Sequence, residues 1–502
     1  MSSQIDLKPE ISWLAAFNVY LNRRVMAMLF LGFSAGLPLF LIFSTLSLWL
    51  RDAGVDRSAV TYFSWAALAY SFKFIWAPVI DKLPLPFLHT LLGRRRSWLL
   101  VAQLAVIFAI AWMAMIDPAQ GLRGMAFAAV LLGFSSASQD IVIDAYRIEA
   151  VKKEYQAAMS AMYIAGYRIG MLVSGAGGLY LASYFSTENQ YNYDAWQTTY
   201  LIMAIIMLVG VVTTLLIKEP EINKKVEAYL HDLSDYLRFF VMFIVMVGAF
   251  IYGFKIFNFG FSNGFINEIV RLFISLLFSL AGIYLLVILN IVNRKMVYST
   301  YVEPVVDFFK RYGKAAILLL LLVGLYRISD IVLGVIANVF YHDIGFSKNE
   351  IATTTKLFGI IMTLIGGFLG GLMTMRYGVM RILLLGAILS AVTNLLFMLL
   401  AQNGHDIVFL SGVIAADNLS AGLASAAFIA YLSSLTNISF TAVQYAILSS
   451  LMTLFPKLLG GYSGSMVNEL GYSSFFLMTA LLGVPVILLI FYLMIKKPNL
   501  LK

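Results

Sequence analysis

Apolar stretches long enough to cross a lipid bilayer recur along the whole of this chain, and no other feature constrains its fold as strongly. A membrane-spanning helix needs about 20 apolar residues to cross a hydrocarbon core of roughly 30 Å. Only 12% of the 502 residues are charged, against about 25% in soluble proteins. The chain is therefore predicted to be an all-α, polytopic membrane protein. Its fourteen expected spans lie near residues 25–50, 59–81, 97–116, 122–146, 157–184, 197–217, 238–257, 271–292, 314–341, 350–373, 380–401, 406–436, 440–467 and 473–495.

The basic residues indicate which ends of these spans face the cytoplasm. If the N-terminus is cytoplasmic, the loops on its side hold 24 of the 35 Lys and Arg residues, whereas the opposite loops hold six. Positively charged loops tend to remain in the cytoplasm during membrane insertion. Both termini are therefore expected in the cytoplasm. The net charge of +9 is assigned to loops that face anionic lipid, so no nucleic acid is expected as a partner.

The sequence lacks the residues that several classes of function need. The chain has no cysteine, which excludes disulfides, thiolate metal sites and a cysteine nucleophile. There is no Walker-type phosphate loop to drive an ATP-dependent pump. A membrane enzyme or a signalling scaffold is disfavoured, because the loops are short and no Ser/His/Asp group has a suitable spacing. No metal and no cofactor are expected, since the four histidines do not pair at metal-ligand spacing: His89, His231, His342 and His405.

The two ends of the chain repeat one another. The sequence IDAY at Ile143–Tyr146 resembles FIAY at Phe428–Tyr431, and a loop with glycine and arginines follows a span in each half. Two halves with the same orientation are typical of secondary transporters. Glu303–Gly313 alternates like an amphipathic helix on the membrane surface, although a simple spacer explains it equally well. The expected parts are a cytoplasmic lead-in 1–24, a six-helix bundle 25–217, a linker with an inserted helix pair 218–313, a second six-helix bundle 314–496 and a cytoplasmic tail 497–502.

Two sets of motifs carry a family resemblance. The segments Trp76–Lys82 and Gly93–Trp98 resemble the signature loop of the major facilitator superfamily, although Ala77 replaces its first glycine and about ten extra residues precede the arginines. In the second copy, Met375 stands in place of the aspartate. Seven further stretches, in order along both halves, resemble the AmpG family of muropeptide permeases: FLGFSAGLPLFL (30–41), AYSFKFIWAP (69–78), SASQDIVIDAYR (136–147), GYRIGMLVSG (166–175), YRISD (326–330), TKLFGI (355–360) and SFTAVQYAILSSL (439–451).

This resemblance implies a fold and a function. The fold would be the major facilitator fold, with two six-helix bundles and two extra helices inserted between them. The function would be proton-coupled import of GlcNAc–anhydro-MurNAc peptides across a bacterial inner membrane, by a monomer without enzymatic activity. Its partners would be the anionic sugar-peptide, protons and the bilayer. Relatives of that family carry acetyl-CoA or siderophores, so a different anionic solute is the alternative substrate.

Ionisable residues inside the spans are the candidate site, because a charge within the bilayer costs several kcal/mol unless it has a purpose. Asp140 and Asp144 lie one helical turn apart on one face, and two close carboxylates cannot both ionise cheaply. A group that gains and loses a proton inside the membrane suits proton coupling. Asp144 is equally well explained as a latch that pairs with Arg147 or with the arginines at 94–96.

Basic residues from both halves reach the depth at which such carriers bind solute. Lys73 and Arg168 have no acid at helical spacing in their own spans, which favours an anionic ligand. Arg327 has Asp330 three residues later, so the two are as well explained by mutual neutralisation. The residues expected to bind substrate are Lys73, Gln139, Arg168, Arg327, Lys356, Tyr70, Asn418 and Gln444, and those expected to have gating or structural roles are Asp81, Arg94, Arg95, Arg96, Arg147 and Asp330.

Overall fold

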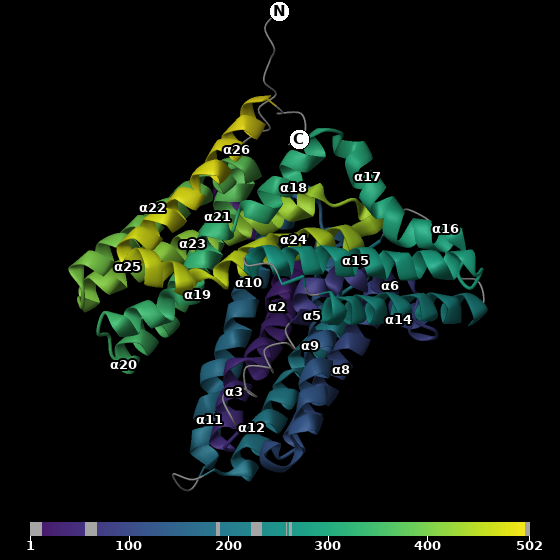
Figure 1. Ribbon diagram of the computed structural model, residues 1–502, viewed down its shortest axis with the longest axis horizontal. Helices are drawn as coiled ribbons and strands as arrows, with labels where there is room; N and C mark the ends of the chain where they lie inside the picture. Colours follow the sequence, from purple (N-terminus) through teal and green to yellow (C-terminus); the bar gives the residue numbers. More distant parts are fainter. Residues whose placement is uncertain are drawn as a thin grey trace, which may run out of the picture.

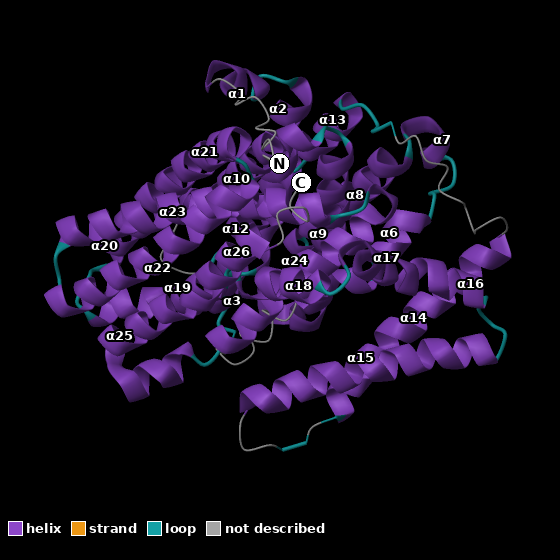
Figure 2. Cartoon of the chain, turned by 90° about the horizontal axis from the view of Figure 1, so that it is seen from above, coloured by secondary structure: helices purple, strands orange, loops and turns teal. Residues whose placement is uncertain are grey.

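Helices account for every regular element in the part of the chain that the structure describes (Figures 1 and 2). The structure is a computed structural model, and it describes residues 13–55, 68–186, 191–221, 233–257, 259–260 and 264–496. The all-α prediction is therefore confirmed for these residues.

The N-terminal half runs from the first described residue to Glu221. Proline and glycine interrupt several of its helices, because proline lacks the N–H that the preceding turn needs. Thus Pro78 lies at the start of α6 and a π-turn with Gly175 and Gly177 joins α10 to α11. The elements are α1 Trp13–Val19, α2 Arg23–Ile42, α3 Ser44–Asp52, α5 Leu68–Phe72, η2 Lys73–Ile75, α6 Ala77–Lys82, α7 Leu88–Leu92, α8 Arg94–Ala114, α9 Pro118–Glu149, η3 Lys153–Tyr155, α10 Gln156–Leu172, η4 Val173–Gly177, α11 Gly178–Phe185, α12 Tyr193–Ile206 and α13 Leu208–Leu216.

An insert separates the two halves. Its first two helices, α14 Leu233–Ile256 and α15 Gly264–Ile288, pack on each other and lie to one side of both halves (Figure 2). They are followed by α16 Arg294–Val297, η5 Tyr298–Val302 and α17 Glu303–Tyr312. The helix expected at Glu303–Gly313 is present as α17, and Gly313 ends it with a φ of 54° that favours glycine.

The C-terminal half contains the remaining helices. Asp406 caps the N-terminus of its longest helix by accepting hydrogen bonds from the amides of Val408 and Phe409. The elements are α18 Ala315–Leu325, α19 Ile328–Asp343, α20 Lys348–Ile351, η6 Ala352–Phe358, α21 Gly359–Tyr377, α22 Val379–Asn403, α23 Ile407–Leu435, η7 Ile438–Phe440, α24 Thr441–Gly460, α25 Ser463–Leu482 and α26 Val484–Lys496.

Twelve helical segments of the described chain are long and apolar enough to cross a membrane. The expected number of fourteen is therefore not confirmed. Of the two expected spans missing from the twelve, 59–81 lies partly outside the described residues and is broken after residue 72. The other, 157–184, is formed by α10, η4 and α11 in succession, and α10 alone has only 17 residues.

Glycine allows the helices within each half to approach closely. A Cβ atom at Gly36 of α2 would overlap the backbone of Tyr167 in α10, and one at Gly166 would overlap that of Leu29. In the C-terminal half, Gly422 of α23 lies equally close to the backbone of α21. Small residues at such contacts are the usual means of packing helices in membranes.

The two halves meet at one end of the molecule and diverge toward the other (Figure 1). We call the meeting region the closed end and define it by Tyr20, Lys82, Arg147 and Glu149 on the N-terminal side. There the Tyr20 hydroxyl donates to the carbonyl of Phe368 at 3.2 Å, and α6, α9 and α10 pack against α21, α23 and α24. Away from this end, α11 and α12 run in one direction in Figure 1, and α20 and α25 in another.

Candidate functional site

Asp144 lies at the centre of a buried ion-pair network near the closed end. One carboxylate oxygen is 3.3 Å from the Lys73 ammonium, and the other is 3.3 Å from the Arg147 guanidinium. Asp144 is 5% exposed, Lys73 is 7% exposed and Arg147 is fully buried. Lys73 comes from the short 3-10 segment η2, whereas both other residues come from α9. Burying three charges is tolerable only because they compensate one another.

Asp140, one turn earlier in α9, has a different environment. It is 6% exposed, and its Oδ1 atom has no hydrogen-bond partner among the described residues. Lys73 attracts it electrostatically and Asp144 repels it. The neighbouring Gln139 is fully buried, and neither polar atom of its amide has a partner within the described chain. Unpaired buried polar groups are rare, so each of these atoms needs an explanation.

Arg147 connects the two halves. Its guanidinium donates to the hydroxyl of Ser160 in its own half at 3.1 Å and to that of Ser433 in the other half at 2.6 Å. It also lies 4.9 Å from the ring centroid of Tyr445 on α24. Asp144 thus holds an arginine that binds across the interface. This geometry favours the first of the two latch partners predicted for Asp144, because the arginines at 94–96 have other partners.

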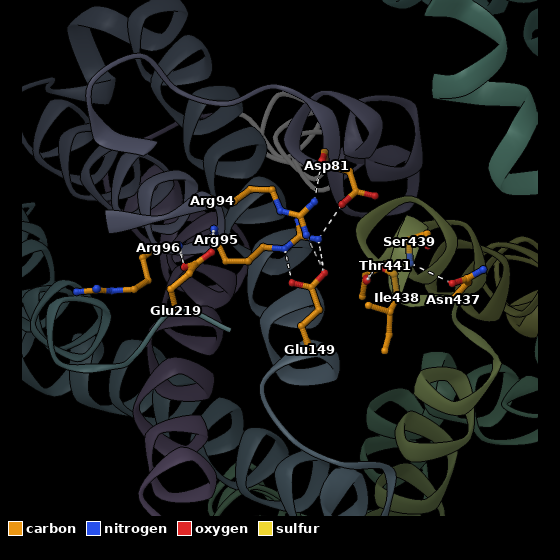
Figure 3. A network of polar contacts seen from close by, with 10 residues as sticks. All are labelled: Asp81, Arg94, Arg95, Arg96, Glu149, Glu219, Asn437, Ile438, Ser439 and Thr441. Atoms are coloured by element: carbon orange, nitrogen blue, oxygen red, sulfur yellow. Dashed lines mark hydrogen bonds and ion pairs between the residues drawn. The ribbon is translucent and has the colours of Figure 1, made fainter. Parts of the chain in front are cut away.

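Those other partners form a second network at the closed end (Figure 3). Arg95 binds Asp81 at 2.7 Å and, through Nε, Glu149 at 2.9 Å. Arg94 binds Glu149 at 3.2 Å. The carboxylate of Glu219 accepts from the backbone amides at the start of α8, where an acid is favourable because of the helix dipole. The loop of the family signature therefore joins α6, α8 and α9. It lies beside η7 of the C-terminal half, where the Lys82 ammonium is 5.1 Å from the ring centroid of Phe440.

Two arginines from opposite halves approach each other deeper in the protein. Arg168 of α10 and Arg327, just before α19, repel one another electrostatically. Arg327 is neutralised by Asp330 at 3.2 Å and donates to the hydroxyl of Ser425 at 2.6 Å. The expected pair of Arg327 and Asp330 is thus present. Arg168 forms no ion pair within the part of the chain that the structure describes.

Asp417 was not predicted as a site residue, yet it lies in this second group of charges. It accepts a hydrogen bond from Thr393 at 3.2 Å, and it interacts electrostatically with Asp330 and Arg327. Its carboxylate stands inside the apolar span 407–435, and this position alone was a sufficient signal.

The remaining predicted site residues lie in several places. The Tyr70 hydroxyl donates to Ser136 at 2.6 Å and faces the Asp140 region. Asn418 accepts from Thr363 at 2.9 Å between α21 and α23. Gln444 lies at the closed end, where its amide binds Arg311, Asp307 and the backbone of Asn437. Lys356 belongs to η6, but its side chain lies outside the described residues.

Comparison with known proteins places the chain in a family. The model of the Major Facilitator Superfamily matches residues 28–326. "Putative transporter AmpG 4" of Rickettsia conorii is 32% identical over 95% of this chain and 98% of the relative. "Anhydromuropeptide permease" of Escherichia coli strain K12 is 30% identical over 94% of this chain and 80% of the relative.

Solved structures of this superfamily share the fold. The E. coli fucose:proton symporter FucP superposes with a TM-score of 0.61 at 9% identity, over 94% of this chain and 98% of that one. The proton:xylose symporter XylE gives 0.58 at 12% identity, over 95% of both chains. The predicted major facilitator fold is thereby confirmed. The family model and the AmpG relatives confirm a multi-pass inner-membrane transporter of a small molecule rather than an enzyme. The chain belongs to the AmpG family of permeases within the major facilitator superfamily.

Proposed function

We propose that this permease imports GlcNAc–anhydro-MurNAc peptides across the bacterial inner membrane, driven by protons, for recycling of the cell wall. The choice of substrate is supported by the AmpG relatives and by the name of the E. coli relative, an anhydromuropeptide permease. The closed end is assigned to the cytoplasm together with both termini, because the basic loops gather there. A carrier whose halves meet at the cytoplasmic side can receive solute from the opposite side. It acts as a monomer.

The environment of Asp140 is the observation that best supports proton coupling. A carboxylate that is 6% exposed and has an unpartnered oxygen within the described chain is costly to keep ionised. Binding one proton removes that cost, and the repulsion by Asp144 favours the same step. Asp144 differs, because Lys73 and Arg147 already compensate its charge. Asp140 is therefore the first proton acceptor, and Asp144 is the carboxylate that responds to it.

Arg168 is the cation available to an anionic solute. Its neighbour Arg327 has Asp330, whereas Arg168 has no counter-ion within the described residues. A guanidinium in a poorly solvated site binds a carboxylate with two parallel hydrogen bonds. A muropeptide supplies such carboxylates on its peptide, and sugar hydroxyls for amides such as those of Gln139 and Asn418.

These roles give a sequence of events. The solute carboxylate binds between Arg168 and Arg327 and reduces the repulsion between the halves. A proton then neutralises Asp140, which changes the charge beside Lys73 and Asp144. Asp144 in turn loosens its hold on Arg147, and the contact of Arg147 with Ser433 breaks. The closed end can then open toward the cytoplasm.

Uptake by right-side-out membrane vesicles tests this proposal. Vesicles that contain the wild type should accumulate labelled anhydro-muropeptide when an inward proton gradient is imposed, and a protonophore should abolish accumulation. Asp140→Asn should lose most of the gradient-driven uptake while still binding the ligand. Asp343→Asn is the matched control, because this aspartate is the last residue of α19 and its side chain is 48% exposed.

Each part of the proposal can fail separately in this assay. Equal uptake with and without the gradient would remove proton coupling. Full activity of Asp140→Asn would remove Asp140 from the coupling site. Binding of acetyl-CoA or a ferric siderophore, with no competition by the anhydro-disaccharide, would replace the substrate and leave the carrier mechanism intact.

A further inference from the structure

The helix that carries Lys73 is broken at the level of this lysine. After α5, the backbone forms the 3-10 segment η2, and the α-helix resumes at α6. The two residues that flank η2 have distorted torsions. Phe72 has φ −106° and ψ 9°, and Trp76 has φ −107° and ψ −3°. Pro78 has no N–H with which to continue the ladder. The position of Lys73 against Asp144 therefore depends on what holds this break.

The break leaves a carbonyl group without its usual partner. In an uninterrupted helix the Ile75 carbonyl would accept from the amide of Val79, but that amide donates to Trp76 at 2.9 Å. The hydroxyl of Tyr301, in η5 of the insert, donates to the Ile75 carbonyl at 3.3 Å. An unpaired carbonyl in a buried place is unfavourable. A residue more than 220 positions later in the chain thus completes the hydrogen bonding of the broken helix.

A second contact comes from the other end of the insert. Phe250 of α14 is 6% exposed, and its ring centroid lies 4.8 Å from that of Phe72, the residue next to Lys73. Met242 and Met246 of α14 belong to the same buried cluster as Ile75. The insert therefore touches the break on both sides of Lys73, by a ring contact before it and by a hydrogen bond after it.

The pair of Lys73 and Asp144 lies among other ionisable groups. They come from all the elements packed around it, namely Tyr70 of α5, Asp140 and Arg147 of α9, Tyr163 and Tyr167 of α10, and Tyr445 and Lys457 of α24. A displacement of Lys73 therefore changes the electrostatic potential at each of these groups.

We propose that the insert is a brace for this helix break, and that Tyr301 and Phe250 are positioning residues that hold Lys73 against Asp144. The inference rests on the proposed proton coupling and gives the insert a part in it. The two six-helix bundles pack on each other without contacts from α14 and α15. The insert would instead set the pH at which the carrier works, by fixing the cation beside its carboxylates.

Tyr301→Phe is the sharpest test, because it removes one hydroxyl and no ring. With the break loosened, Lys73 leaves Asp144 more often and the carboxylates bind protons more tightly. The midpoint of the pH profile of uptake should move to higher pH by about half a unit. Tyr298→Phe, in the same short element and 47% exposed, should leave the midpoint unchanged.

A labelling experiment gives a readout that does not depend on transport. The chain contains no cysteine, so Phe74→Cys introduces a single thiol into η2. Its reaction with a maleimide should be at least about fivefold faster in the Tyr301→Phe background, since a lost hydrogen bond makes local opening easier. Phe250→Leu, compared with Phe240→Leu at a 57% exposed position of the same helix, repeats both measurements if Tyr301→Phe does not fold.

The two readouts separate the possible failures. An unchanged labelling rate in both Tyr301→Phe and Phe250→Leu would overturn the brace. Faster labelling with an unchanged pH midpoint would overturn its link to Lys73. If wild-type uptake proves independent of protons, the proposed function fails, while the labelling rates still decide whether the insert holds the break.

Discussion

The two halves of this permease each bury a group of opposite charges, but the two groups differ in their connections. In the N-terminal half, Asp144 binds Lys73 and Arg147, and Arg147 extends to Ser433 of the other half. In the C-terminal half, Arg327 binds Asp330 and Ser425, and both partners belong to that half. The first group is therefore hydrogen-bonded across the interface, whereas the ion pair and the side-chain hydrogen bond of Arg327 stay within its own half.

The internal repeat makes this difference more informative. If Ile143–Tyr146 is aligned with Phe428–Tyr431, the position of Asp140 corresponds to Ser425, that of Asp144 to Ile429 and that of Arg147 to Leu432. The two copies thus share an Ala-Tyr pair on a helix, while only the N-terminal copy carries charges at these three positions. Because a buried charge is costly without a purpose, these charges indicate that α9 has a task beyond packing.

The two groups of charges also differ in how far their side chains are exposed to solvent. Arg147 is fully buried, whereas the side chains of Arg327 and Asp330 are 21% and 16% exposed. Breaking a fully buried ion pair leaves an uncompensated charge and costs more than breaking a pair that is partly exposed to solvent. The same substitution should therefore have very different effects in the two halves.

Arg147→Leu should have the largest effect, because it gives the N-terminal half the residue found at the equivalent position of the other copy. Loss of the guanidinium removes a buried partner of Asp144 and the contact with Ser433, at a cost of about 3–5 kcal/mol. Spin labels at Lys153→Cys and Lys310→Cys, one on each side of the closed end, should move apart in the variant. The measurement is the distance distribution between the labels.

Arg327→Leu is the control for this prediction. It removes an arginine that is bound within one half, so the distance between the labels should stay at its wild-type value. If Arg327→Leu opens the closed end as much as Arg147→Leu does, the distinction between the two charge groups is wrong.

Asp417→Asn should have a smaller effect of a different kind. The substitution removes a negative charge that competes for Arg327, so an anionic solute should bind more tightly, by about fivefold for roughly 1 kcal/mol. The dependence of uptake on the proton gradient should persist. Ligand binding to the purified protein and gradient-driven uptake measure the two properties separately. Loss of proton dependence would transfer the coupling role to the C-terminal half.

The fold was largely predictable from the sequence, because it depends on properties that add up along the chain. Apolar length identifies the spans, and the repeat identifies the halves. The exceptions arise where a helix is broken by a local cause, as at Pro78 and at the π-turn with Gly175. A pattern of apolar residues does not record such breaks, and the expected span 59–81 also lies partly outside the described residues, so the predicted number of spans was not confirmed.

The candidate site was predictable as a set of residue types but not as a set of contacts. Asp140, Asp144 and Lys73 were identifiable because charges are rare in apolar spans. The partners of Gln444 are at the closed end rather than beside a solute, since α17 returns to that end and places Asp307 and Arg311 there. The hydrogen bond of Tyr301 to Ile75 had no signal in the sequence, because it joins segments that are distant along the chain.

The smallest expected effect concerns a feature of the C-terminal half outside the spans. Glu350 accepts from the amide and the hydroxyl of Ser347 at 2.8 Å each and lies 3.3 Å from His405, and these contacts lower the pKa of its carboxyl. A carboxyl with a lowered pKa stabilises the folded protein above its ordinary pKa, and this contribution is lost as the pH falls through the lowered value. Because the group is exposed, the contribution is small. Acidification from pH 7 to about 3 should therefore slightly lower the protection of the Ser347 amide in the wild type, measured as its exchange rate relative to the intrinsic rate at each pH. In Glu350→Gln the exchange of the Ser347 amide should already be faster at pH 7, and acidification should cause no further loss of protection. Glu469→Gln, at an exposed position of α25, should behave as the wild type.

An identical response of Glu350→Gln and the wild type would show that this contact does not hold the loop between α19 and α20. The C-terminal half would then lack a pH-sensitive contact at that loop.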